Sequence, residues 1–332
     1  MLKDLPEQSV NTCITSPPYW GLRNYQEEEQ LGLEDTPEEF VESLVKVFRE
    51  VKRVLRDDGT VWLNLGDSYA NQRSGEGADT MKNLNVDTHG YKNPTEKQEK
   101  TNKNFNQRLN YGNLKQKNLV GIPWRVAFAL QADGWYLRQD IIWHKPNPMP
   151  ESVRDRCTKA HEYIFLLGKN AKYYFDNEAI KEKGVMTSSG SKQRDTRETH
   201  GIGGGNAGLN LAKQRMKKEL IEKGFVKRNK RSVWTVTTKP FKGAHFATFP
   251  PDLIKPCVLA GCPEGGTVLD PFGGAGTTGL VAQQHNRNCI LIELNPEYAQ
   301  ISRDRLYNDA PLFADVESEV WKSSTKSSEN EE

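Results

Sequence analysis

A glycine-rich segment close to the C-terminal end constrains the fold of this chain more than any other feature. Residues 267–279 have the sequence Thr-Val-Leu-Asp-Pro-Phe-Gly-Gly-Ala-Gly-Thr-Thr-Gly, which predicts a buried strand, a tight turn and the start of a helix. Glu293 follows nineteen residues after Gly274, at the end of the next predicted strand. Glycines that let the backbone approach a ligand, with a spaced carboxylate that accepts hydrogen bonds from ribose hydroxyls, indicate a nucleotide-binding site.

The surroundings of this turn narrow down its ligand. No lysine follows the glycines, which disfavours a phosphate-binding loop of the NTPase kind. Only 53 residues follow Gly279, enough for one strand–helix unit and a tail, so most of the sheet must come from upstream in a permuted order. A cofactor with a ribose but no phosphates fits best, and S-adenosylmethionine is the obvious candidate.

The N-terminal part of the chain supplies strands and helices of the same α/β kind. Residues 9–15 predict a strand, and Thr36 followed by Pro37 predicts the start of a long amphipathic helix. Residues 60–65 predict a second strand. Strand, helix and strand in this order are typical of a mostly parallel sheet with helices on both faces.

The first predicted strand ends at a second unusual sequence, Ser16-Pro17-Pro18-Tyr19. Two consecutive prolines remove two backbone donors and fix two φ angles, which predicts a rigid ledge of hydrogen-bond acceptors beside the rings of Tyr19 and Trp20. Such a ledge suits a planar group with an exocyclic NH₂, because its acceptors take both hydrogens while a ring stacks on the face. Both motifs follow parallel strands, so we expect them on the same rim of the sheet.

In this order the two motifs resemble those of the beta group of DNA amino-methyltransferases, in which the catalytic motif precedes the target-recognition region and the cofactor motif comes last. The resemblance extends to residues 65–67, 143–147 and 245–250. It implies a class I methyltransferase fold, which is Rossmann-like, with a circularly permuted motif order and an inserted target-recognition region. It also implies an S-adenosylmethionine-dependent enzyme that acts on double-stranded DNA.

The resemblance implies roles for individual residues. Ser16 and the Pro17 carbonyl hold the amino group of a flipped base. Pro18 completes the ledge, and Tyr19 stacks on the base ring. The residues implied to bind the cofactor are Asp270, Pro271, Phe272, Gly273, Gly274, Gly276, Thr277, Thr278 and Glu293, with Thr248 and Phe249 near its methionine part. Three further residues have two open interpretations, as walls of the base pocket or as caps of strand ends: Asn64, Asp67 and Lys145.

The identity of the methylated base depends on one position. Serine before Pro-Pro-Tyr resembles the cytosine-N4 enzymes more than the adenine-N6 enzymes, which usually carry Asp or Asn there, so cytosine N4 is the prediction and adenine N6 the alternative. An amine in RNA or protein, and a non-catalytic DNA-binding module that retains the fold, are further alternatives. No metal is predicted, because the five cysteines contain no Cys-x-x-Cys pair.

The predicted organisation has four parts: a discontinuous catalytic domain at 1–70, 119–176 and 236–308, a polar mobile insertion at 71–118, a target-recognition region at 177–235 and a polar tail at 309–332. Charge supports the position of the recognition region. Residues 181–231 carry fourteen Lys/Arg against five Asp/Glu. A basic block on a nearly neutral chain indicates contact with a polyanion.

Other features limit where such a chain acts and with what. No apolar run approaches the roughly eighteen residues of a transmembrane helix, and no secretory signal is visible, which predicts a cytoplasmic protein with no membrane contact. The resemblance implies a prokaryotic or phage-encoded protein. A homodimer and a cognate restriction endonuclease are candidate protein partners. Family members usually carry a strand ending in Gly-Asp ahead of the catalytic motif. This chain begins too late for one, so either the sheet lacks that edge strand or the chain starts short.

Overall fold

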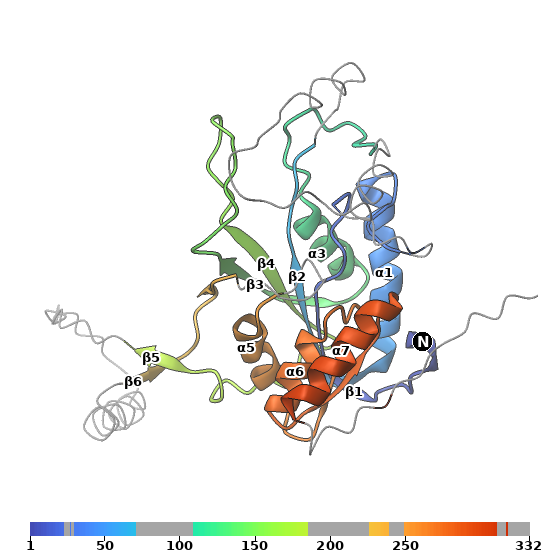
Figure 1. Ribbon diagram of the computed structural model, residues 1–332, viewed down its shortest axis with the longest axis vertical. Helices are drawn as coiled ribbons and strands as arrows, with labels where there is room; N and C mark the ends of the chain where they lie inside the picture. The colour runs from blue at the N-terminus through green and yellow to red at the C-terminus, as the bar shows by residue number, and fades with distance from the viewer. Residues whose placement is uncertain are drawn as a thin grey trace, which may run out of the picture. The chain divides into compact units, whose positions relative to one another are not determined.

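The computed structural model describes residues 1–22, 27, 30–70, 109–184, 226–238, 249–310 and 317 (Figure 1). The chain divides into two compact units, one made of Met1–Phe175 and Ser232–Glu332 and the other of Asp176–Arg231. Helices and strands carry the labels of Figure 1. The first unit contains both of the predicted motifs.

The first unit is built on a seven-stranded sheet with the order β7-β3-β4-β2-β1-β8-β9. Its strands are β1 (Val10–Thr15), β2 (Leu55–Leu65), β3 (Tyr136–His144), β4 (His161–Gly168), β7 (Val233–Thr235), β8 (Thr267–Asp270) and β9 (Asn288–Leu291). Among these seven strands only β4 runs antiparallel to its neighbours. The sheet order departs from the chain order, since the late strand β8 lies beside β1, as a permuted motif order requires.

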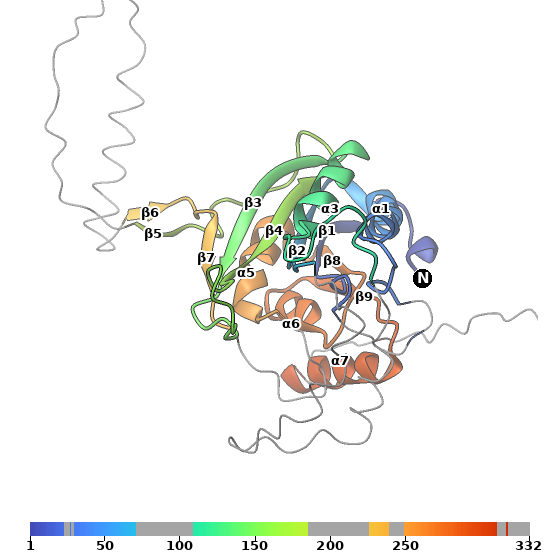
Figure 2. The ribbon, with the colours of Figure 1, turned by 90° about the horizontal axis from the view of Figure 1, so that it is seen from above.

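Helices cover both faces of this sheet (Figure 2). The helices on one face are α1 (Pro37–Val54) and α3 (Ile122–Ala132), and those on the other are α5 (Pro251–Gly261), α6 (Thr277–Gln284) and α7 (Pro296–Asp309). A short 3-10 helix, Leu2–Asp4, precedes β1. The predicted mostly parallel α/β sheet with helices on both faces is therefore confirmed.

The long helix α1 shows how the sequence builds one of these layers. Thr36 caps it by accepting a hydrogen bond from the backbone N–H of Glu39, while the Glu39 carboxylate accepts one from the Thr36 N–H. Apolar residues then recur at helical spacing, and Phe40, Leu44 and Phe48 are fully buried. The cap and the apolar stripe agree, so the predicted start and face of this helix are confirmed.

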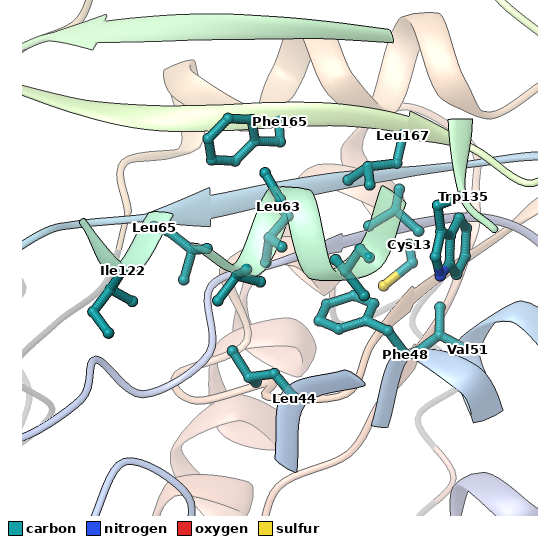
Figure 3. Close-up of a cluster of buried hydrophobic side chains, with 14 of the residues drawn as sticks. Cys13, Leu44, Phe48, Val51, Leu63, Leu65, Ile122, Trp135, Phe165 and Leu167 are labelled. Carbon is teal, nitrogen blue, oxygen red and sulfur yellow. The ribbon is translucent and has the colours of Figure 1, made fainter. Parts of the chain in front are cut away.

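The core lies between this helix layer and the sheet (Figure 3). Buried side chains of α1 and α3 form one cluster with side chains of β1, β2 and β4, which include Cys13, Leu63, Leu65, Phe165 and Leu167. Burial raises the pKa of the Cys13 thiol well above its ordinary value, so this cysteine acts as an apolar packing residue. A packed core of this kind fixes the strand ends, which a site at their carboxyl edge requires.

Two local predictions differ from the structure. Residues 233–235 fall in the predicted target-recognition region, but they form β7 and pair in parallel with β3. The pattern near residues 173–175 predicts a short strand, whereas the chain is irregular there and Phe175 stacks on Trp62 with ring centroids 6.1 Å apart. The Tyr174 N–H donates to the Asp58 carbonyl of β2 at 2.8 Å, but residues 173–175 do not form a strand, and Phe175 packs on the sheet. A local pattern cannot distinguish this arrangement from a strand.

In the described residues of the second unit, β5 (Glu182–Gly184) and β6 (Val226–Arg228) form an antiparallel pair. The Glu182 carboxylate accepts hydrogen bonds from Arg228 at 3.0 Å and from Arg231 at 2.8 Å. One carboxylate thus orders two guanidinium groups of the basic block.

Three negative findings concern only the described residues. In that part of the chain, no further strand pairs with β9, which is the outermost strand on its side of the sheet. Within the same ranges, no helix is both long enough and apolar enough to cross a membrane. The described His, Cys, Asp and Glu side chains form no group that could hold a metal ion.

Candidate active site

The two predicted motifs lie side by side at one rim of the sheet. β1 and β8 are parallel neighbours, and residues 16–19 follow one while the glycine turn follows the other. Both therefore leave the sheet at its carboxyl-terminal edge, where open α/β sheets bind ligands. A hydrogen bond of 2.6 Å from the Thr15 hydroxyl to the Asp270 carboxylate joins the two strand ends.

The ledge after β1 has one buried and one accessible side. Pro17 is buried, whereas Ser16, Pro18 and Tyr19 are partly exposed. Within the described part of the chain, the Ser16 hydroxyl makes no hydrogen bond. Its oxygen can therefore accept a hydrogen from a bound amine without first breaking an internal contact.

Trp20 does not belong to this surface. Its side chain is only 3% exposed, its Nε1 donates to the Glu34 carbonyl at 2.8 Å, and the ring of Tyr111 packs edge-on against it at 5.3 Å. The expectation that both aromatic rings face a ligand is wrong for Trp20. The reason is a turn in which the Leu22 N–H bonds to the Tyr19 carbonyl, so that the chain bends and the indole enters the core.

Glu162 lies at the centre of a polar cluster beside the ledge, which we call the Glu162 cluster and which also contains Tyr19, Asn64 and Lys145. Its Oε2 accepts hydrogen bonds from the Tyr19 hydroxyl at 2.6 Å and from Asn64 Nδ2 at 3.2 Å. Its Oε1 accepts a hydrogen bond from Lys145 Nζ. Glu162 is not among the site residues predicted from the sequence. The only local signal is a charge at the start of an apolar strand, and it is the antiparallel direction of β4 that brings this residue to the rim.

Asp67, Asn64 and Lys145 each had two interpretations, as a wall of the base pocket or as a cap of a strand end, and the structure separates Asp67 from the other two. Asp67 Oδ1 accepts hydrogen bonds from three backbone N–H groups, including those of Gly121 at 2.9 Å and Ile122 at 3.1 Å. These two groups lie at the start of α3, so Asp67 caps that helix from the end of β2. Capping therefore describes Asp67, whereas Asn64 and Lys145 contact the partly exposed ledge through the polar cluster.

The glycine turn after β8 has a backbone that glycine favours. Gly274 and Gly276 have φ angles of 51° and 73°, in the left-handed region where other residues are strained. A Cβ on Gly276 would lie 2.2 Å from Ser302 Oγ of α7. Gly276 thus provides both the turn into α6 and the space for close packing of α6 against α7.

Glu293 reaches this turn from the segment after β9. Its Oε2 accepts a hydrogen bond from the Gly274 N–H at 2.7 Å, and its Oε1 accepts one from the Asn295 N–H at 3.0 Å. Burial raises the pKa of Glu293, while the backbone hydrogen bonds act against that rise. A carboxylate has about four acceptor positions, and backbone N–H groups occupy only some of them, so acceptor capacity stays open for the hydroxyls of a ribose. The residues present therefore fit the predicted cofactor at this point.

Asp270 supports the turn from inside. It is 2% exposed and accepts hydrogen bonds from the hydroxyls of Thr15 and Thr278, each at 2.6 Å, and from the Phe272 N–H at 3.1 Å. Burial raises the pKa of Asp270 to about 6, although these hydrogen bonds act in the opposite direction. One buried carboxylate thus connects β1, β8 and α6.

The other predicted cofactor residues divide by exposure. Phe272 and Gly274 are partly exposed at the turn, and Phe249 is partly exposed ahead of α5. The buried residues that frame the turn are Pro271, Gly273, Gly276, Thr277 and Thr278. Thr248 lies outside the described residues. Phe272, Gly274 and Glu293 are therefore the predicted cofactor residues at the turn that are accessible to a ligand.

This arrangement defines a class of protein. The fold is a mostly parallel sheet with one antiparallel strand and a glycine turn paired with a spaced carboxylate, as in nucleotide-binding α/β folds. Together with the Pro-Pro ledge on the neighbouring strand, these are the features that the resemblance to amino-methyltransferases of the class I fold implies. The model of a DNA methylase family, N6/N4 methyltransferases, matches residues 10–304. The chain belongs to this family. The predicted amino-methyltransferase and its S-adenosylmethionine cofactor are thereby confirmed.

Individual relatives match over nearly the whole chain. The type II methyltransferase M.Cfr9I of Citrobacter freundii is 46% identical over 315 residues, which cover 93% of this chain and 85% of the relative. The type II methyltransferase M.SmaI of Serratia marcescens is 43% identical over 310 residues, which cover 92% of this chain and 87% of the relative. The match to the family model, over residues 10–304, includes both motifs and the segments between them.

Solved structures share the fold. The PvuII DNA methyltransferase, a cytosine-N4-specific enzyme, superimposes with a TM-score of 0.55 at 18% identity, over 92% of this chain and 82% of that chain. A protein of Thermus thermophilus, crystallised in complex with S-adenosyl-L-methionine, gives a TM-score of 0.54 at 23% identity, over 94% and 91% of the two chains. At these identities the likeness concerns the fold alone, and the predicted class I methyltransferase fold is confirmed.

Proposed function

We propose that this chain is a site-specific DNA methyltransferase that transfers a methyl group from S-adenosylmethionine to the exocyclic N4 amine of a cytosine flipped out of double-stranded DNA. The observation that carries the proposal is the position of the Ser16 ledge next to the glycine turn, on two parallel strands whose ends are hydrogen-bonded. An amine bound at the ledge and a cofactor bound at the turn would be neighbours, which is the proximity that group transfer needs.

The ledge raises the reactivity of the amine by accepting its hydrogens. The lone pair of an exocyclic amine is delocalised into the base ring, which makes the nitrogen a poor nucleophile. Hydrogen bonds to the Ser16 hydroxyl and the Pro17 carbonyl return electron density to nitrogen and fix its direction. Pro18 keeps the ledge rigid, and Tyr19 stacks on the base. Because Ser16 is not a strong base, the amine proton leaves late in the reaction or to water.

The glycine turn binds the cofactor in this proposal. Glu293 accepts hydrogen bonds from the ribose hydroxyls, and Phe272 and Gly274 line the nucleoside. The resemblance assigns Phe249 and Thr248 to the methionine part of the cofactor, while the buried residues of the turn hold the nucleoside surface in place. When bound, S-adenosylmethionine supplies an activated methyl group on its sulfonium.

The preference for cytosine N4 rests on Ser16. A serine hydroxyl before Pro-Pro-Tyr is the form that resembles cytosine-N4 enzymes, whereas a carboxylate or carboxamide is usual in adenine-N6 enzymes. Adenine N6 is the alternative, because the acceptors of the ledge suit either planar amine.

The basic block is the proposed contact to the duplex. We assign residues 177–235, of which the last three form β7, to target recognition, with Lys and Arg contacting phosphates and a few side chains contacting base edges. Residues 71–118 are the proposed insertion and residues 309–332 the tail of the catalytic domain. The type II designation of the relatives supports a restriction–modification context in the cytoplasm of a prokaryote or a phage host, with a cognate endonuclease as partner and a homodimer as the candidate assembly.

The test is nucleoside mass spectrometry on DNA from a methylation-free bacterial host that expresses the chain. Ser16→Ala removes the proposed acceptor. Ser9→Ala is the matched control, because its exposed hydroxyl bonds only to the nearby Pro6 carbonyl before β1 begins. We expect N4-methylcytosine with the wild type and with Ser9→Ala, and its loss with Ser16→Ala.

Other outcomes discriminate between the alternatives. N6-methyladenine would keep the mechanism and contradict the base assignment. Loss of cofactor binding together with the absence of any modified base would indicate a non-catalytic DNA-binding module, because a pure binder has no need for Glu293 or the glycine turn. Methylation of RNA or protein in the same cells, with unmodified DNA, would contradict DNA as the substrate.

A further inference from the structure

We propose that Glu162 is a positioning residue for methyl transfer, which holds the ring of Tyr19 in the orientation that receives the flipped base. The inference rests on the proposed function, in which Tyr19 stacks on the base. It adds a residue outside both sequence motifs, from a strand that lies two positions away from β1 in the sheet.

The hydroxyl end of Tyr19 is anchored by a charged acceptor. The 2.6 Å hydrogen bond to Glu162 Oε2 is short, as expected when a phenol donates to a carboxylate. This hydroxyl lies 3.4 Å from Asn64 Oδ1, too far for a strong hydrogen bond, so Glu162 is the principal anchor.

Glu162 is itself held from two sides, and its side chain is only 14% exposed. Lys145 binds one carboxylate oxygen, and its ammonium lies 4.2 Å from the centre of the Trp143 ring. Asn64 binds the other oxygen and also donates to the Tyr163 carbonyl at 3.0 Å. An anchor fixed at both oxygens can transmit a defined orientation to a residue that it contacts.

The ring of Tyr19 is confined along its edge by Gly66. A Cβ at Gly66 would lie 2.5 Å from Tyr19 Cε2 and 3.1 Å from both Cδ2 and Cζ. Gly66 does not have a left-handed φ, so it is the space and not the backbone that requires a glycine here. The ring is thus held at its hydroxyl by Glu162 and at its edge by the backbone of residue 66, which defines the plane it presents to a base.

If the ring of Tyr19 is already oriented before the base arrives, it positions the exocyclic amine of the base at no further cost in side-chain entropy. Loss of this orientation is expected to slow transfer more than it weakens binding of either substrate, because the misplacement matters at the reacting nitrogen. A cluster that only stabilised the strand ends would instead lower folding stability and leave the rate of the folded enzyme unchanged.

The kinetic test compares Glu162→Gln, Tyr19→Phe and the double variant. Glu50→Gln is the matched control, because it removes an ion pair with Arg53 within helix α1. We expect Glu162→Gln to lower kcat by about 10- to 100-fold, as the loss of a hydrogen bond to a charged acceptor predicts, with the KM for DNA and the Kd for S-adenosylmethionine within about twofold. Gly66→Ala should lower kcat similarly with Glu162 intact.

The double variant separates action through Tyr19 from action elsewhere. If Glu162 acts through the Tyr19 hydroxyl, its substitution adds little once that hydroxyl is gone, so the two effects are far from multiplicative. Multiplicative effects would overturn the proposal.

A second readout is independent of catalysis. With tyrosine labelled by ¹³C at Cζ, the Tyr19 signal is identified as the one absent from Tyr19→Phe, and we expect it to move in Glu162→Gln and to stay in place in Glu50→Gln. An unmoved Tyr19 signal in Glu162→Gln overturns the proposal even if the wild type methylates DNA. If the wild type transfers no methyl group to DNA, the proposed function fails on that result, and the labelled signal still decides whether Glu162 orients Tyr19.

Discussion

Replacement of Gly276 by alanine tests the packing of the glycine turn against α7. The residue has a φ of 73°, and a Cβ there would lie 2.2 Å from Ser302 Oγ, 3.0 Å from Ser302 Cβ and 3.2 Å from Ser302 Cα. Ser302 is only 6% exposed, so its hydroxyl can rotate but its Cβ and Cα can move only with the helix. Gly265 is a matched control, because it has the same φ of 73° and nothing within 4 Å of its Cβ position.

The expected cost has two parts that the pair of variants separates. A left-handed backbone costs an alanine about 1–2 kcal/mol at either position. Overpacking adds about 1–3 kcal/mol at Gly276 alone. We therefore expect Gly276→Ala to lower the free energy of unfolding by about 2–5 kcal/mol and Gly265→Ala by about 1–2 kcal/mol.

The assay is equilibrium urea unfolding followed by tryptophan fluorescence, together with equilibrium dialysis of S-adenosylmethionine. Cofactor binding should weaken in Gly276→Ala and not in Gly265→Ala, because only the former distorts the turn that carries Gly274. Ser302→Gly opens the space, so the double variant should be less destabilised than the sum of the single variants. Equal stability of the two alanine variants would refute the packing argument.

Three further predictions concern carboxylates of the site. Because burial raises the pKa of Asp270 from 3.8 to about 6, its charged form opposes folding, and the wild type loses stability from this group as the pH rises from about 4 through 6. Relative to the wild type, the free energy of unfolding of Asp270→Asn should therefore rise by about 2 kcal/mol between pH 4 and 7.5. A difference between the two proteins that does not change with pH in urea unfolding would contradict this. Asp67→Ala should lower the free energy of unfolding by about 1–2 kcal/mol, because the start of α3 loses its hydrogen-bond acceptor. Asp67→Asn keeps a side-chain oxygen and should retain most of this stability. Equal losses for the two variants in urea unfolding would show that capping is not the role of Asp67. Glu293→Gln should raise the Kd for S-adenosylmethionine about tenfold with little change in DNA binding, since one acceptor becomes a donor, and an unchanged Kd in equilibrium dialysis would argue against ribose binding by Glu293.

Much of the fold could be predicted because its signals are local. Three of these signals depend on residues that are close in the sequence: the capping box at Thr36, the apolar stripe of α1 and the glycine turn after β8. The same is true of the Pro17-Pro18 ledge, whose shape follows from two fixed φ angles. The prediction that β1 and β8 share a rim was also accessible, because parallel strands end at the same edge of a sheet.

The rest depended on which strands become neighbours and in which direction they run. β7 is only three residues long, too short for a recognisable pattern, and pairing with β3 is what defines it. The aromatic residue Trp20 looked equivalent to Tyr19 in sequence, but a turn directs it into the core. Asp67 and Asn64 stand three residues apart, yet one caps α3 and the other binds Glu162.

The sequence by itself determined the class of fold, the permuted order of the motifs, and the two short segments that make the ledge and the cofactor turn. Their conformations follow from proline, glycine and capping residues, whose preferences act within a few residues of chain. Only the tertiary structure decided that Glu162 holds Tyr19, that Gly66 gives the ring its space, and that Asp270 supports the turn from inside. These contacts join residues distant in the chain, so they exist only after strand order, strand direction and packing have been set.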